Sequence, residues 1–66
     1  MPKFKTGDKV RVRLDSASTY RGRIGVVAEE PFKDSFGIWY MVRFKLKGLV
    51  AVNLLIEEDL EVATDW

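Results

Sequence analysis

The sequence contains no cysteine and no histidine. The absence of thiols excludes disulfides and a cysteine nucleophile, and the absence of imidazole removes the side chain most often used as a general base. Structural zinc is held by Cys and His side chains, so a zinc site is excluded as well. We therefore expect a protein that binds no metal and no cofactor and that is not an enzyme.

Long apolar runs are also missing. Runs such as Ile38–Val42 and Leu49–Val52 fall far short of the ~20 residues that span a membrane. The lysine-bearing start lacks the apolar stretch of a signal peptide. The chain has 66 residues, of which 47% are apolar, so there is room for one folded domain, residues 1–66. We expect a small soluble domain in the cytoplasm.

Neither sign of charge is in excess, because 11 Lys and Arg face 10 Asp and Glu. The two signs are nevertheless separated along the chain: residues 1–23 carry a net charge of +5 and residues 48–66 a net charge of −5. One interpretation is a basic surface that meets phosphates or an acidic protein. Its candidate residues are Lys9, Arg11, Arg13, Arg21 and Arg23.

The alternative is that the basic first strand lies beside the acidic last strand, near Glu61, and is neutralised there. Each cross-strand pair of opposite charges contributes only ~0.2–1 kcal/mol, but such pairs would mask the basic surface. The isoelectric point of about 8.0 lies below the value of about 9 that is typical of nucleic-acid-binding domains. This comparison favours the self-neutralised arrangement.

Alternating apolar and basic residues predict a first strand over Lys9–Leu14, with Leu14 among the inward side chains. A second strand is expected over Arg23–Glu29, before Pro31, which cannot donate to a strand ladder. Gly25 lies inside this strand, where a glycine marks a bulge or a close approach of two backbones.

The rest of the chain predicts further short elements and no segment with sustained helical periodicity. They are a loop over Pro31–Gly37, a strand over Ile38–Leu46, a turn at Lys47-Gly48, a strand over Leu49–Asn53, a helical turn over Ile56–Leu60 and a final strand over Leu60–Ala63. This order predicts an all-β fold, a small five-stranded SH3-like barrel with one short 3-10 turn before the last strand. An OB-type barrel would require more residues and a longer helix.

Two short segments, Gly7–Val12 and Gly22–Val27, resemble the KOW-type opening of SH3-like barrels. Over roughly residues 7–63 the chain also resembles the small stromal subunit IV of photosystem I and the variable chain of ferredoxin–thioredoxin reductase. The matching segments there include Met41–Lys45 and Glu58–Val62. This second resemblance implies an accessory barrel that docks a partner protein without a cofactor, whereas the KOW resemblance implies RNA or DNA.

A more distant resemblance links Gly7–Arg11 and Tyr20–Ile24 to the type II dihydrofolate reductases, which are tetrameric SH3-like barrels. Their active pore is lined by a Val-Gln-Ile-Tyr segment, where this chain has Val50–Asn53 without Gln or Tyr. The reductase activity is therefore not expected. The adjacent carboxylates of Glu57–Asp59 lie on one turn, so they do not converge across a pocket as acid–base pairs do.

Trp39 and Met41 are the candidate partner site, because alternation places both on the outer face of the third strand. Phe32 and Phe36 lie in the preceding loop, and an outward Trp is a typical hot spot for a protein partner or for base stacking. In a second interpretation the loop folds back and a phenylalanine covers Trp39. In a third, the chain associates with itself through this surface.

Tyr20 is the remaining candidate, since Arg21 and Arg23 beside an aromatic ring suit an anion. Equally, Tyr20 caps one end of the barrel while both arginines face water. We expect a non-enzymatic barrel that acts as a protein-docking or accessory module, through a protein partner or self-association. A KOW-type RNA- or DNA-binding domain is the alternative.

Overall fold

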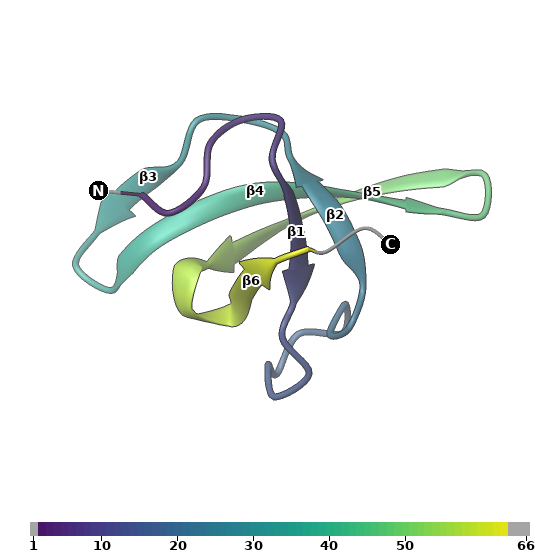
Figure 1. The fold of residues 1–66 in the computed structure, drawn as a ribbon, viewed down its shortest axis with the longest axis horizontal. Helices are drawn as coiled ribbons and strands as arrows, with labels where there is room; N and C mark the ends of the chain where they lie inside the picture. The colour runs from purple at the N-terminus through teal and green to yellow at the C-terminus, as the bar shows by residue number, and fades with distance from the viewer. Residues whose placement is uncertain (1, 64–66) are drawn as a thin grey trace.

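The chain forms one antiparallel sheet that curls into a half-barrel, in a computed structural model that describes residues 2–63 (Figure 1). Along the sheet the strand order is β3-β4-β2-β1-β6, and β5 pairs with the other edge of β4. The elements are β1 (Lys9–Val12), β2 (Ile24–Val27), β3 (Phe32–Asp34), β4 (Gly37–Leu46), β5 (Leu49–Ile56), the 3-10 turn η1 (Glu57–Asp59) and β6 (Leu60–Val62). The all-β fold predicted from the sequence is confirmed, and its curl is compatible with an SH3-like barrel.

All five predicted strands are present, and an additional short strand, β3, lies in the segment expected to be a loop. It forms a hairpin with β4 because Asp34 Oδ1 accepts hydrogen bonds from the N–H groups of Phe36 (2.8 Å) and Gly37 (3.2 Å). Gly37 has φ 145, which glycine adopts without strain. The carboxylate thus closes the turn that joins the two strands.

Two strands differ in length from the prediction. β5 continues to Ile56 rather than ending at Asn53, because Leu54 and Leu55 keep their register with β4. β1 ends at Val12, and Leu14, which was expected to face the core, is 77% exposed. The chain turns away from the sheet at this point, and the Leu14 side chain lies against Gly22 instead.

The core fills the concave side of the sheet with side chains from every long strand. Its buried members are Phe4, Val10, Val12, Val27, Tyr40, Val42, Phe44, Leu55 and Leu60. Tyr40, Val42 and Phe44 all come from β4, which confirms the predicted alternation in that strand. Tyr20 packs on this core from the long loop and stacks on Phe44 with 4.7 Å between ring centroids.

Gly25 lies where β2 approaches β4 closely. A Cβ atom at this position would lie 2.6 Å from Cγ1 of Val42 and 2.8 Å from the carbonyl oxygen of Arg43. Distances this short are essentially absent from real structures. The close backbone approach predicted at Gly25 is therefore confirmed, and it lets the sheet curl over its own core.

The segment before β1 is held to the barrel by a buried phenol. The hydroxyl of Tyr40 donates to Glu57 Oε2 over 2.6 Å and accepts from the backbone N–H of Phe4 over 3.2 Å. The Lys3 N–H donates to the same carboxylate oxygen over 3.0 Å. The hydrogen bond from Tyr40 lowers the pKa of Glu57, and burial raises the pKa of Tyr40. Three distant segments therefore meet at one hydroxyl group.

Candidate functional site

The convex face of the β3–β4–β5 sheet carries a row of apolar side chains that the core does not use. Cross-strand partners in an antiparallel pair lie on the same face, so the register brings these residues together. Trp39 lies opposite Phe32 on one side and Ile56 on the other, and Met41 lies opposite Leu54. We call this surface the outer strip; its residues are Phe32, Trp39, Met41, Val50, Val52, Leu54 and Ile56.

Several members of the outer strip are strongly exposed to solvent. Phe32 is 48% exposed, Val50 60% and Val52 52%. Val50 and Val52 point outward because they alternate along β5 with Ala51 and Leu55, which face the core side of the sheet. An apolar strand with one face uncovered is a common place for another molecule to bind.

Trp39 is half-buried and fixed in one orientation. Its indole N–H donates to Asp34 Oδ1 over 2.9 Å, the same oxygen that closes the β3–β4 turn. This hydrogen bond is the main reason that the pKa of Asp34 lies below its ordinary value. This hydrogen bond therefore orients the indole ring on the outer strip.

The structure brings three of the predicted partner-site residues onto one face and separates the other two. Phe32, Trp39 and Met41 share the outer strip. Phe36 lies at the tip of the β3–β4 turn and is 78% exposed. Tyr20 lies elsewhere, stacked on Phe44 at the core, as expected of a residue that caps the barrel.

Arg11 of β1 meets a carboxylate of β6, as the self-neutralised arrangement predicts, whereas Arg13, just after β1, meets a carboxylate of the next loop. Arg11 lies opposite Glu61 of β6, and its Nε donates to Glu61 Oε2 over 2.6 Å. Arg13 is paired with Asp15 in the next loop at 3.1 Å, and this hydrogen bond raises the pKa of Arg13. Part of the basic surface is therefore neutralised within the fold.

Arg21 and Arg23 have no carboxylate partner among residues 2–63. Arg21 donates from Nη1 to the carbonyl oxygen of Ser18 at 3.5 Å, and Arg23 is exposed at the end of the same loop. Tyr20 points into the core rather than toward these guanidinium groups. The three residues therefore do not form a joint pocket.

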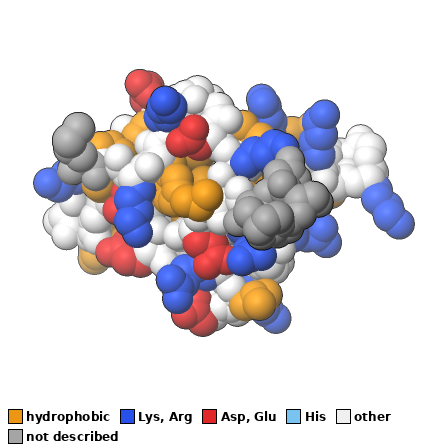
Figure 2. Space-filling model, in the orientation of Figure 1, with side chains coloured by type: hydrophobic (Ala, Val, Ile, Leu, Met, Phe, Trp, Pro, Cys, Tyr) orange, Lys and Arg blue, Asp and Glu red, His pale blue; other side chains and the backbone are white. Residues whose placement is uncertain are grey.

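A shallow hollow of about 340 Å³ lies on the outer face where β1, β2 and β4 run side by side. Lys9, Val26 and Arg43 form a row across the three strands, and Lys45 and Ile24 complete the rim. No carboxylate of the described residues lines it. Figure 2 shows Lys and Arg side chains gathered toward the end where the β4–β5 hairpin projects.

The sequence predicted that Arg43 and Lys45 face water, but it did not join them to Lys9 in one site. The signal was present in the alternation of the third predicted strand. Only the register of β2 between β1 and β4 puts these residues beside one another. The outer face therefore has an apolar part, the outer strip, and a basic part next to it.

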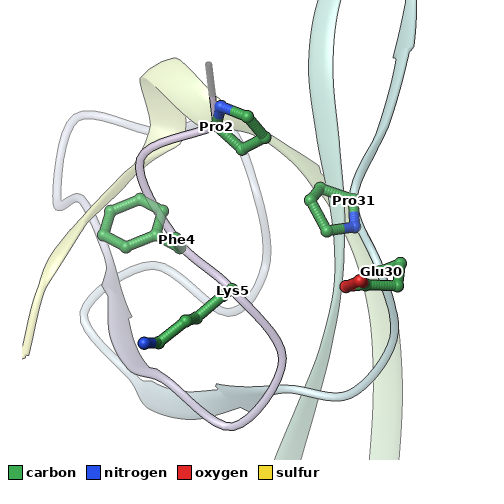
Figure 3. Close-up of a pocket in the computed structure, with 5 residues that line it drawn as sticks. All are labelled: Pro2, Phe4, Lys5, Glu30 and Pro31. Carbon is green, nitrogen blue, oxygen red and sulfur yellow. The ribbon is translucent and has the colours of Figure 1, made fainter.

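A second hollow, of about 360 Å³, lies between the segment before β1 and the connection from β2 to β3 (Figure 3). It is lined by Pro2, Phe4, Lys5, Glu30 and Pro31. Figure 3 shows the Lys5 and Glu30 side chains on opposite walls of this hollow.

Within residues 2–63 no three Asp or Glu side chains come together as a metal site would require. The same part of the chain has no helix that is long and apolar enough to cross a membrane. No protein-family model, curated protein or solved structure matches the chain. Its function is therefore inferred from the geometry of its surface.

Proposed function

We propose that this protein is a non-enzymatic docking module that binds a partner protein through the outer strip. The observation that carries the proposal is that the apolar side chains of the outer strip are exposed and are not part of the core. A pre-oriented Trp at one end of the row is the type of residue that dominates binding energy at interfaces. The resemblance to accessory barrels of electron-transport complexes supports the same class of function.

The charges beside the outer strip indicate the kind of partner. Arg43 and Lys45 continue the face of β4 beyond Met41, and their cross-strand partners are Val52 and Val50. A complementary surface would carry an apolar centre and carboxylates at one end. Opposite charges at the rim steer association and fix orientation more than they add affinity. We therefore expect the partner to be an acidic protein with an exposed apolar patch.

The test is a comparison of captured proteins between two charged variants. Met41→Glu introduces a carboxylate into the outer strip, on β4 and away from the free edge of β5. Leu14→Glu introduces the same group at an exposed apolar position outside the strip. Each variant is immobilised and exposed to an extract of the source cells, after a thermal melt has shown that it is folded.

We expect the wild-type protein and Leu14→Glu to retain the same protein, and Met41→Glu to lose it. Purified partner and wild-type protein should then bind each other in a calorimetric titration. Equal capture by both variants would show that the outer strip is not the binding surface.

A second candidate function is the binding of RNA or DNA, favoured by the hollow that contains Lys9, Arg43 and Lys45. Two phosphate contacts, from Arg43 and Lys45, would give a log–log salt dependence of affinity with a slope of roughly −1.4 to −1.8. A gel-shift experiment with single-stranded RNA and duplex DNA at low salt tests it. Binding that is lost in Arg43→Glu would support this function over protein docking, and absence of any shift would remove it.

A further inference from the structure

The outer edge of β5 is a long strand edge with no partner in the described part of the chain. β5 pairs only with β4, and no hydrogen bond reaches its other side from residues 2–63. Its eight residues, Leu49–Ile56, contain no charge and no proline. Strand edges of this kind pair readily with another strand unless they are protected.

The two other free edges of the sheet are protected in the usual ways. β3 and β6 have three residues each. β3 carries Lys33 and Asp34, and β6 carries Glu61, which is bound to Arg11. Short length and charge both discourage edge-to-edge pairing. The exposed edge of β5 therefore differs from its counterparts in the same molecule.

The backbone groups that face this free edge can be identified from one hydrogen bond. The carbonyl oxygen of Met41 accepts from Ala28 N–H over 2.7 Å, so the Met41 backbone points away from β5. Met41 and its partner Leu54 are thus a non-hydrogen-bonded pair, and the N–H and C=O of Leu54 point to the free edge. By alternation the same holds for Val52 and Val50.

We propose that a second copy of this chain occupies the edge, with β5 of the two copies paired antiparallel about a two-fold axis at Val52. Val50 of each copy then lies opposite Leu54 of the other, and the edge-facing backbone groups of Val50, Val52 and Leu54 are hydrogen-bonded. The two sheets become one continuous sheet. Because each copy uses its one unprotected edge, the assembly closes at a dimer.

Charge at the two ends of β5 supports a second copy in this orientation. The strand begins after Lys47 in the β4–β5 turn and ends at the acidic turn η1, Glu57–Asp59. Antiparallel pairing of identical strands brings the basic end of one copy to the acidic end of the other. Parallel pairing would instead oppose like charges, which destabilises a pair of strands. Along the paired strands themselves no charges oppose each other, because β5 contains no charged residue.

The outer face would also become continuous across the axis. Val50, Val52 and Leu54 of one copy lie beside the same residues of the other, so apolar side chains that are exposed in the monomer cover one another. This inference rests on the edge of β5 and not on the proposed docking function. The two are distinguishable because Met41→Glu leaves the edge intact.

Sedimentation equilibrium of the purified protein tests the dimer. We expect the mass to rise from 7.6 kDa to twice that value with increasing concentration. Val52→Pro removes an N–H that points to the free edge and not to β4, so the monomer keeps its ladder while the dimer loses a central bond. Val52→Lys opposes two ammonium groups at the axis, and Ile24→Lys is its matched control on the outer face away from β5.

The expected result is a dimer for wild type and Ile24→Lys, and a monomer for both Val52 variants. Amide hydrogen exchange of the wild-type protein provides a second measurement that needs no variant. The N–H groups of Val50, Val52 and Leu54 should exchange rapidly in dilute solution and slowly in concentrated solution. A protein that remains monomeric at all concentrations would overturn the proposal, and so would a dimer whose concentration-dependent protection lies outside β5.

Discussion

The replacement of Gly25 by alanine should destabilise the fold through steric contact alone. The backbone of Gly25 does not adopt a positive φ, so alanine can take its conformation without strain. The added Cβ, however, meets Cγ1 of Val42 at 2.6 Å, the carbonyl oxygen of Arg43 at 2.8 Å and Cδ1 of Phe44 at 2.9 Å. Two of these atoms belong to fully buried side chains and the third to the backbone, so none can move freely.

Overpacking of this kind typically costs about 1–3 kcal/mol, and we expect Gly25→Ala near the upper end of that range. For a domain of this size a loss of 1 kcal/mol lowers the melting temperature by about 4–8 °C, so the loss should be on the order of 10–20 °C. Thermal and urea unfolding followed by circular dichroism measure it.

Gly48→Ala is the matched control, because its φ is 78 and nothing lies within 4 Å of the added Cβ. Its cost is the left-handed backbone conformation only, about 1 kcal/mol. Val42→Ala should partly relieve Gly25→Ala, so the double variant should lose less stability than the sum of the single variants. A Gly25→Ala protein within about 0.5 kcal/mol of wild type would refute the close approach of β2 and β4.

Two further predictions concern the charged groups. Trp39 fluorescence, measured in a Trp66→Phe background, should change as the pH is lowered and Asp34 becomes protonated. The midpoint should lie below about 3.9, the pKa of a free Asp, because the hydrogen bond from Trp39 lowers the pKa of Asp34 in the folded protein. Asp34→Asn should abolish the transition, whereas a midpoint above that of free Asp would contradict the hydrogen bond. A double-mutant cycle of Arg11→Ala and Glu61→Ala should give a coupling energy of about 0.2–1 kcal/mol that decreases with added salt; a coupling of zero at low salt would show that the pair does not form in solution.

The alternation rule was most informative where one face of a strand is polar. In β1, basic residues alternate with Val10 and Val12, and both valines are fully buried as predicted. The separation of charge along the sequence likewise predicted the pairing of Arg11 with Glu61. The burial of the valines could be predicted from the sequence because the residues that alternate in β1 differ in their affinity for water.

The same rule gives no answer for a strand that is apolar on both faces. β5 reads as an uninterrupted run except for Asn53, so the sequence does not reveal that Val50, Val52 and Leu54 face outward. Their orientation is set by register with β4, which is a long-range property. β3 was missed for a different reason, since its three residues show no alternation and its hairpin depends on a turn that Asp34 closes.

The pairing of the first strand with the last also determines how the chain reaches its fold. β4 and β5 are joined by a two-residue turn, and hairpins of this kind form within about 1–10 μs. β1 must instead find β6 at the far end of the chain, with Val10 opposite Val62, and it does so only after a long loop has closed. We expect this closure to set the folding rate, so that weakening the Arg11–Glu61 contact slows folding while leaving the rate of hairpin formation unchanged.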